Sequence, residues 1–206
     1  MLNVNNGTLD LLSGELREHS RDDLITKLAP VDYDPDARMD RTYAWLCEIM
    51  NNSKELIEFI KRMVGYSLTG DTREQILPIC FGIGANGKST LLGLIQETLG
   101  DYATSTPTSP LMVKRGDTIP NDLAALKGAR FVAAMEAEDG RRFSEALVKQ
   151  LTGGDVISAR FMRGEFFTFR PSFKIRMAVN HKPIIRGTDV GIWRRVRLLP
   201  FTVCIP

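Results

Sequence analysis

The sequence predicts an α/β fold in which helices flank a central parallel sheet, with a small helical subdomain at the N-terminus. Three observations support this prediction. Runs of β-type residues alternate with runs of helical spacing after residue 73, as expected for parallel strands joined by helices. A glycine-rich segment, residues 82–89, follows one β-type run and precedes a helical run. A length of 206 residues with 43% hydrophobic side chains suffices for one α/β core.

The chain divides into a predicted lead-in and helical pre-domain, residues 1–72, and a predicted core, residues 73–206. The first 30 residues alternate short apolar pairs with turn residues, which indicates a hairpin-like segment. Between residues 40 and 64, apolar residues recur at helical spacing, with a break at residues 51–53. We therefore expect two amphipathic helices in the pre-domain.

The core begins with a short apolar run of strand length, residues 76–81. Pro78 lies inside this run and has no N–H to donate, so the paired part of the strand is expected to start after it. The other predicted core elements are a helix ending at Gly100, a loop at 104–110, a helix at 121–127, a strand at 130–135, a helix at 144–151, a hairpin at 156–170, a strand at 173–179 and an apolar run at 196–201.

The glycine-rich segment matches the pattern G-x-x-x-x-G-K-[S/T] between a strand and a helix. In this pattern, backbone N–H groups surround the β- and γ-phosphates, and the helix N-terminus adds its positive end. Lys88 supplies an ammonium charge, and the Ser89 hydroxyl joins the Mg²⁺ shell. We therefore expect ATP and Mg²⁺ to be held by Gly82, Gly84, Ala85, Asn86, Gly87, Lys88, Ser89 and Thr90.

Acidic residues follow the next predicted strand of the core. The apolar run 130–135 ends in Glu136, and Glu138 lies two residues further on. An ATPase needs an acid at the end of a neighbouring strand to hold Mg²⁺ and to orient or deprotonate the attacking water. Glu136 is the expected metal ligand, and either Glu136 or Glu138 is the expected base. The alternative is a buried strand followed by an acidic surface turn.

Polar residues near the end of the chain complete the candidate catalytic set. Asn180 follows the predicted strand 173–179, where it could sense the γ-phosphate or position the water, or could simply cap a turn. Arg194 and Arg195 precede the last apolar run, at a domain edge where an arginine finger acting on a neighbouring subunit would lie. Ordinary surface arginines are the alternative interpretation.

The charge is distributed unevenly along the chain. Residues 160–197 carry ten lysines and arginines against two acids, a balance of +8, whereas the other residues sum to −6. Such an asymmetry indicates a surface for an anion, although a solvated, salt-bridged face would give the same count. Within this region, Arg160 and Arg163 flank the turn of the predicted hairpin, where they could contact nucleic acid or pair with Glu165 and Asp155.

Other compositional features limit the class of protein. Three cysteines, at 47, 80 and 204, have no metal-binding spacing and are expected to be reduced, buried thiols. The sequence has no run of eighteen apolar residues and no basic, apolar start. A soluble, intracellular protein without a membrane partner is therefore expected.

Taken in order, the motifs resemble the superfamily 3 helicases, in the branch fused to phage, plasmid and poxvirus-type primases. The resemblance covers nearly the whole chain. It is carried by the pre-domain leading to residues 60–70, the loop GANGKST at 84–90, the acids EAE at 136–138, and the stretches KQLTGGD at 149–155, AVNHKP at 178–183 and GIWRRV at 191–196.

This resemblance implies an AAA+ fold, a ring of six identical subunits, and ATP-driven translocation on single-stranded DNA during replication. It implies that Asn180 is the first sensor, that Arg194 or Arg195 is the finger, and that the hairpin near Arg160 and Arg163 contacts DNA, together with Lys149. A primase domain or replication partner, and a phage or mobile element in the cytoplasm of a bacterial host, are also implied. Family members continue beyond the last strand, so the chain is expected to be part of a longer protein.

Two other classes of function remain open from the sequence. A P-loop nucleotide kinase has a similar length but places its loop near the N-terminus, whereas about eighty residues precede the loop here. A DNA-binding assembly module could hold nucleotide without hydrolysing it. Stimulation of ATP hydrolysis by single-stranded DNA would separate these classes.

Overall fold

The computed structural model describes residues 1–113, 121–135 and 142–205. Its centre is a five-stranded parallel sheet with the order β10-β4-β9-β6-β5. The strands are β4 (Leu77–Phe81), β5 (Ala103–Pro107), β6 (Phe131–Met135), β9 (Lys174–Val179) and β10 (Val196–Pro200). The predicted fold class, a parallel sheet flanked by helices, is confirmed.

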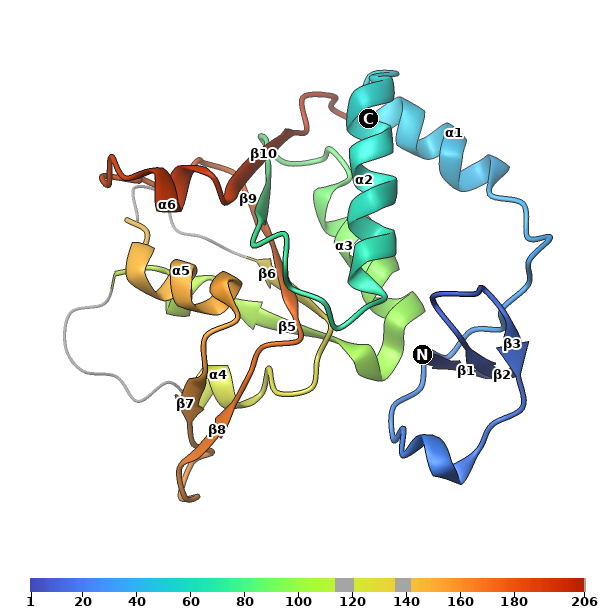
Figure 1. Ribbon diagram of the computed structural model, residues 1–206. Coiled ribbons are helices and arrows are strands. Elements are labelled where there is room, and N and C mark those ends of the chain that lie inside the picture. Colours follow the sequence, from blue (N-terminus) through green and yellow to red (C-terminus); the bar gives the residue numbers. More distant parts are fainter. Residues whose placement is uncertain (114–120, 136–141, 206) are drawn as a thin grey trace.

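Helices cover both faces of the sheet (Figure 1). They are α1 (Asp40–Ile49), α2 (Lys54–Ser67), α3 (Lys88–Leu99), α4 (Asn121–Ala124), α5 (Glu145–Gly153) and α6 (Val190–Trp193), with short 3-10 helices η1 (Arg21–Asp23), η2 (Gly100–Tyr102) and η3 (Ser109–Leu111). Helices α1 to α3 share one buried apolar cluster with the sheet, and α5 and α6 share another on its opposite face. Alternate residues of each central strand supply both clusters, as expected for a sheet buried on two sides.

The N-terminal segment forms a small antiparallel sheet of β1 (Leu2–Val4), β2 (Gly7–Leu9) and β3 (Leu16–Arg17). The predicted hairpin-like lead-in and the two helices after it are therefore confirmed. The Ser53 hydroxyl accepts a hydrogen bond from the Leu56 N–H at 3.4 Å, which caps the start of α2. Leu2 and Val4 are buried in the same cluster as α3, so this small sheet packs onto the core.

The prediction of a loop over residues 104–110 was wrong, because β5 occupies most of this segment. All five residues of β5 pair with β6 at the edge of the sheet. Threonine suits an extended backbone, and the proline stands at the last position of an edge strand, where a missing N–H is tolerated. A composition typical of loops is therefore compatible with an edge strand.

The prediction that strand pairing starts after Pro78 is correct for the pairing of β4 with β9 and wrong for its pairing with β10. Pairing of β4 with β9 begins at Ile79, directly after the proline. Pairing with β10 begins earlier, because the Leu77 N–H donates to the Arg195 carbonyl at 2.7 Å. Successive N–H groups of a strand point to opposite neighbouring strands. Pro78, which lacks an N–H, therefore faces β9, and it lies just before the first residue of β4 that pairs with β9.

The cysteines are free, but their predicted burial holds for only one of them. Cys80 is buried in β4, where desolvation raises its thiol pKa to about 12. Cys47 is half-buried, and Cys204 is exposed because it follows the last strand at the surface.

Candidate functional site

Neighbouring strands bring two parts of the predicted ATP site together at the carboxyl edge of the sheet. The glycine-rich loop predicted to bind phosphate, residues 82–89, follows β4, and the exposed Asn180 follows β9. This loop is called the phosphate-binding loop below, after this prediction. In the register of these strands, Phe81 lies opposite Val179. The Gly82 N–H donates to the Val179 carbonyl at 3.3 Å, so Asn180 lies beside the start of the loop.

The strand that precedes the predicted acids in the sequence, β6, ends at the same edge of the sheet. β6 pairs with β9, and its last residue, Met135, lies opposite Ala178. Glu136 and Glu138 come directly after this strand in the sequence, but both lie outside the described residues. Their roles as metal ligand and base stay predictions.

Two glycines of the loop are required by their surroundings. A Cβ added to Gly82 would lie 2.1 Å from the carbonyl oxygen of Phe201 and 2.6 Å from the Asn86 amide nitrogen. Gly87 has a left-handed φ of +84°, and its added Cβ would lie 3.0 Å from the side chain of Ile49. Larger residues at either position would distort the loop.

The Lys88 side chain lies inside the loop and is only 5% exposed. Its ammonium donates to the Gly82 carbonyl at 2.6 Å and to the Asn86 side-chain oxygen at 2.9 Å. Burial lowers the pKa of this lysine, because a desolvated ammonium lacks the hydration it has in water. A phosphate beside the ammonium would replace that lost solvation.

The rest of the loop also fits a phosphate ligand with its Mg²⁺. Gly84 and Ala85 form its exposed tip, and Ala85 has a left-handed φ of +48°. No side chain caps the N-terminus of α3, so its first N–H groups can meet an anion. The hydroxyls of Ser89 and Thr90 are carried by exposed residues in the first turn of α3. The loop therefore offers N–H groups, an ammonium and hydroxyls to a triphosphate.

The predicted finger arginines lie at the opposite, amino edge of the sheet. The Arg195 carbonyl accepts the N–H of Leu77, the first residue of β4, whereas the phosphate-binding loop follows the last residue of β4. At about 3.3 Å per residue, the strand separates the two ends by about 13 Å. Neither arginine can therefore lie close to the phosphate-binding loop of its own chain.

Arg194 and Arg195 differ in their surroundings. Arg195 is buried and donates from Nε to the Thr152 hydroxyl at 3.0 Å, and it also bonds the Gly191 carbonyl. Arg194 is exposed and donates to the Gln75 side chain. Arg194 is thus accessible at the surface despite its bond to Gln75, whereas Arg195 is held inside its own chain.

The predicted hairpin is also confirmed, and it lies at the amino edge because it leads directly into β9 (Figure 1). It consists of β7 (Ile157–Ala159) and β8 (Phe167–Phe169) in antiparallel pairing. In its turn, Arg163 is exposed with a left-handed φ of 60°, and the Gly164 N–H donates to the Phe161 carbonyl at 2.9 Å.

The tip of the hairpin combines aromatic rings with guanidinium groups. The guanidinium of Arg160 lies over the ring of Phe166, 5.0 Å from its centroid, and the ring of Phe161 stacks on that of Phe167. Phe161, Met162 and Phe166 are exposed. Among the described residues, no ion pair joins Arg160 or Arg163 to Glu165 or Asp155, the pairing that the sequence left open.

Lys149, the third predicted nucleic-acid contact, forms an ion pair on the surface. Its ammonium lies 2.7 Å from a carboxylate oxygen of Asp189, and this hydrogen bond lowers the pKa of the aspartate. The other oxygen of Asp189 accepts the Ile192 N–H and caps α6. Lys149 is thus tied to the start of α6 and lies apart from the hairpin tip.

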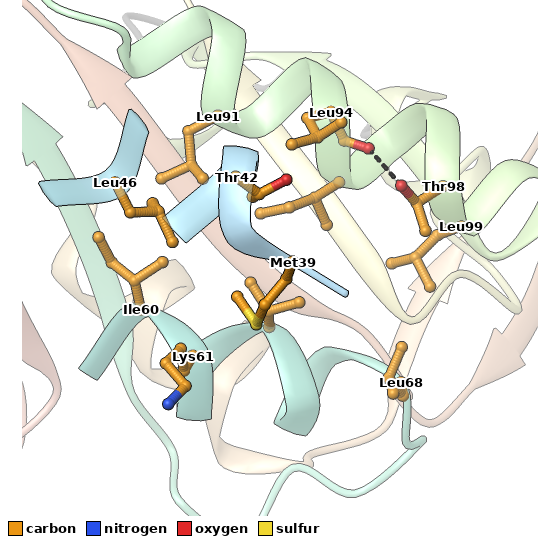
Figure 2. Close-up of a pocket in the computed structure, with 12 residues that line it drawn as sticks. Met39, Thr42, Leu46, Ile60, Lys61, Leu68, Leu91, Leu94, Thr98 and Leu99 are labelled. Atoms are coloured by element: carbon orange, nitrogen blue, oxygen red, sulfur yellow. Dashed lines mark hydrogen bonds between the residues drawn. The ribbon is translucent and has the colours of Figure 1, made fainter. Parts of the chain in front are cut away.

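A separate hollow lies between α1, α2 and α3 (Figure 2). Its volume is about 360 Å³, and apolar side chains such as Leu46, Ile60 and Leu91 line it. The Thr98 hydroxyl at its wall donates to the Leu94 carbonyl of its own helix at 2.8 Å. Lys61 is the one charged residue of the lining, so the hollow lacks the groups that phosphate chemistry requires.

One part of the site has no signal in the sequence. The segment after β10, residues 201–205, lies along the phosphate-binding loop, and the Ile205 N–H donates to the Ala85 carbonyl at 2.7 Å. The Asn86 amide donates to the Phe201 carbonyl at 2.9 Å. These contacts join residues more than a hundred positions apart, so no local motif could predict them.

Comparison with known proteins identifies the family. Residues 1–65 match the family described as D5 N terminal like, and residues 80–195 match a family of unknown function, DUF5906. The chain belongs to the DUF5906 family. Together with the viral relatives below, the matches connect it to D5-like primase–helicase proteins of replication.

Two of the similar proteins come from viruses. The chain is 31% identical over 206 residues to L207/L206 of Acanthamoeba polyphaga mimivirus, which is named as a candidate helicase. It is 23% identical over 208 residues to C962R of African swine fever virus (isolate Tick/Malawi/Lil 20-1/1983), named as a candidate primase. The alignments cover 98% and 96% of this chain but only 22% and 21% of the relatives. The chain thus spans about a fifth of their length.

The fold is similar to that of a solved structure, the apo form of the C-terminal region of NrS-1. The TM-score is 0.62 at 12% identity, over 85% of this chain and 39% of the other. At this identity the similarity concerns the fold alone. Within the described residues, no helix has the length and apolar character needed to span a membrane.

Proposed function

We propose that the chain is the ATP-hydrolysing motor module of a replication primase–helicase that moves on single-stranded DNA. One observation carries the proposal: the sheet separates two kinds of site. The phosphate-binding loop and Asn180 lie at its carboxyl edge, and the cationic, aromatic hairpin tip lies at its amino edge. The match of residues 1–65 to the D5 N terminal like family, and the similarity to viral proteins named as candidate helicase and primase, support this division of roles.

At the carboxyl edge, the loop residues are proposed to hold ATP with Mg²⁺. The Lys88 ammonium, which is already inside the loop, would meet the phosphates, and the Ser89 hydroxyl would join Glu136 as a metal ligand. Bound Mg²⁺ would neutralise charge on the phosphates. Glu136 or Glu138 is the proposed base for the attacking water, and Asn180, which lies beside the loop, is proposed to orient that water.

At the amino edge, an arginine is proposed to act on the ATP of a second copy. The separation of about 13 Å along β4 prevents Arg194 and Arg195 from serving their own loop. A ring of identical subunits, a homo-hexamer, would bring this edge against a neighbouring loop. Exposed Arg194 is the better candidate for this role, because Arg195 is bonded within its own chain.

The hairpin tip is proposed to contact the DNA strand. Arg160 and Arg163 offer charge to phosphates, and the exposed Phe161 and Phe166 offer rings to bases. Lys149 is proposed as a weaker contact, because its ion pair with Asp189 must be shared with the DNA. The proposed partner is a primase domain or another replication protein. We further propose that the protein is encoded by a mobile element and acts in the cytoplasm of a host cell.

The test is the rate of ATP hydrolysis with and without single-stranded DNA, with Lys88→Ala as the control for contaminating ATPases. We expect the DNA to stimulate hydrolysis by the wild-type chain and to have no effect on the variant. Nucleotide binding without any turnover would instead indicate an assembly module. Phosphate transfer to a nucleoside monophosphate would indicate a kinase.

A further inference from the structure

The side chain of Asn86 lies inside the phosphate-binding loop and is bonded at both ends of its amide. It is 3% exposed. Its nitrogen donates to the Phe201 carbonyl at 2.9 Å, and its oxygen accepts from the Lys88 ammonium at 2.9 Å. An asparagine can make both bonds because it carries a donor and an acceptor on one short side chain. The amide therefore connects the loop lysine to the segment after β10.

The segment 201–205 is joined to the loop by more than this amide. The Phe201 N–H donates to the Phe81 carbonyl at 2.8 Å, just before the loop, and the Ile205 N–H donates to the Ala85 carbonyl at 2.7 Å. Phe201 is itself buried. The close approach of Gly82 to the Phe201 carbonyl shows that the two backbones are packed without space between them. The loop thus has one wall made by residues that follow the edge strand β10.

We propose that Asn86 is a positioning residue that fixes the phosphate-binding loop against residues 201–205 and holds Lys88 until nucleotide binds. This inference rests on the proposed function. When phosphates enter, the Lys88 ammonium leaves the Asn86 oxygen for them, and the amide nitrogen keeps its bond to Phe201. Because the amide is neutral, it orients the ammonium without cancelling the charge that attracts phosphate.

Two substitutions separate this role from simple packing. Asn86→Ala removes both bonds and leaves the buried Phe201 carbonyl without its side-chain donor, so we expect ATP affinity to fall by about tenfold to a hundredfold. Turnover at saturating ATP should change less than about threefold, because Lys88 still reaches the phosphates once ATP is bound. Asn86→Leu keeps the branching of the side chain and adds no charge, but it loses both the donor and the acceptor.

The comparison of these variants decides the question. If Asn86 only fills space, the uncharged Asn86→Leu protein, whose side chain has the same branching, will bind ATP like the wild type, and the proposal is wrong. If Asn86 positions the loop, Asn86→Leu will bind ATP about as weakly as Asn86→Ala. Titration with a fluorescent ATP analogue gives the affinity, and steady-state kinetics give KM and kcat separately.

A measurement without nucleotide keeps this inference distinct from the proposed function. Hydrogen exchange of the peptides covering 82–87 and 201–205 should be faster in Asn86→Ala than in wild type. The matched control is Gln150→Ala, which removes another amide that donates to a backbone carbonyl, that of Val156, away from the loop. Unchanged exchange in both peptides would overturn the proposal. Failure of the wild type to bind ATP would overturn the proposed function, while the exchange result would still stand.

Discussion

The two edges of the central sheet use polar groups in opposite ways. At the carboxyl edge, the loop brings together backbone N–H groups at the start of α3, the Asn86 amide and the Lys88 ammonium, the groups proposed to meet phosphate. At the amino edge, cationic side chains are far more numerous, but several of them are bonded inside the fold and are not available to a partner. The comparison shows that the number of charges in a stretch of sequence does not measure the charge it presents to a partner.

Three cations that bond near the end of α2, the half-buried Arg130 and the buried Lys174 and Arg176, illustrate this point. Arg130 donates to the Leu68 carbonyl, Lys174 donates to the Thr69 carbonyl, and Arg176 donates to the Ser67 hydroxyl at 3.3 Å. All three contacts lie at the C-terminal end of α2, where unpaired carbonyls favour positive charge. These side chains hold α2 against the sheet.

The excess charge of residues 160–197 must therefore be interpreted in two parts. Of its ten lysines and arginines, Lys174, Arg176 and Arg195 are buried. The surface available to an anion is smaller than the local balance of +8 suggests, and it includes the hairpin tip with Arg163. A charge count cannot separate the two parts, because burial depends on which face of a strand a residue occupies.

The largest effect is expected at the carboxyl edge. Lys88→Ala should reduce ATP turnover to the background rate, because electrostatic stabilisation dominates phosphoryl transfer. Lys149→Ala, at a surface lysine outside the loop, should leave the rate without DNA nearly unchanged. The turnover rates of both variants are measured as phosphate release and compared with that of wild type. Equal losses in the two variants would contradict the division between the edges.

The next effect tests whether the amino edge acts on another subunit. Arg194→Ala should bind ATP normally but lose about a thousandfold in turnover, the range known for arginine fingers. Mixing it with Lys88→Ala should restore activity, because mixed interfaces combine an intact loop with an intact arginine. Absence of recovery in confirmed mixed assemblies would argue against action between subunits.

Arg195 should respond differently from its neighbour. Arg195→Ala leaves the buried Thr152 hydroxyl and Gly191 carbonyl without their donor, and we expect a loss of about 2 kcal/mol in the free energy of unfolding. The exposed Arg197→Ala serves as the control and should change stability by less than about 0.5 kcal/mol. Urea denaturation measures both. An Arg195 variant as stable as wild type would refute the structural role.

Much of the fold could be predicted because its signals are local. The loop pattern, the helical spacing of α1 and α2, and the turn of the hairpin each lie within a few consecutive residues. The edge strand β5 was missed because pairing with β6 overrides a composition typical of loops. The bonds of Asn86 to Phe201 and of Arg195 to Thr152 were not predictable, because they depend on how distant segments pack.

A smaller effect is expected at the hairpin tip. Arg163→Ala should weaken binding of single-stranded DNA several-fold and equally for different base sequences, because the lost contact is to phosphate. The dependence of affinity on salt should become less steep. Arg73→Ala is the control, since this exposed arginine is not part of the hairpin and is paired with Asp71. The affinity of each protein for a labelled oligonucleotide is measured by titration at two salt concentrations. If both variants bound as tightly as wild type, the proposed contact would be refuted.

The smallest effect concerns Lys174 and the pH dependence of stability. Burial, together with the nearby Arg176 and Arg130, lowers the pKa of this lysine to about 7, whereas in the unfolded chain its pKa is near 10.5. Between these values the unfolded chain binds more protons, so this group makes the folded state more stable as pH rises from about 7 towards 10. Below about pH 7 both states carry the charge, and the full cost of burying it is present.

Lys174→Met should remove this dependence, because a thioether of similar length has no proton to lose. We expect the Tm of wild type, relative to the variant, to rise between pH 7 and pH 9.5, and to stay constant between pH 5.5 and pH 6.5. The loss of the bond to the Thr69 carbonyl shifts the variant by the same amount at every pH, so only the slope is informative. If the curves of Tm against pH for wild type and variant were parallel from pH 5.5 to pH 9.5, Lys174 would have an ordinary pKa. The cations at the end of α2 would then be better solvated than their burial indicates.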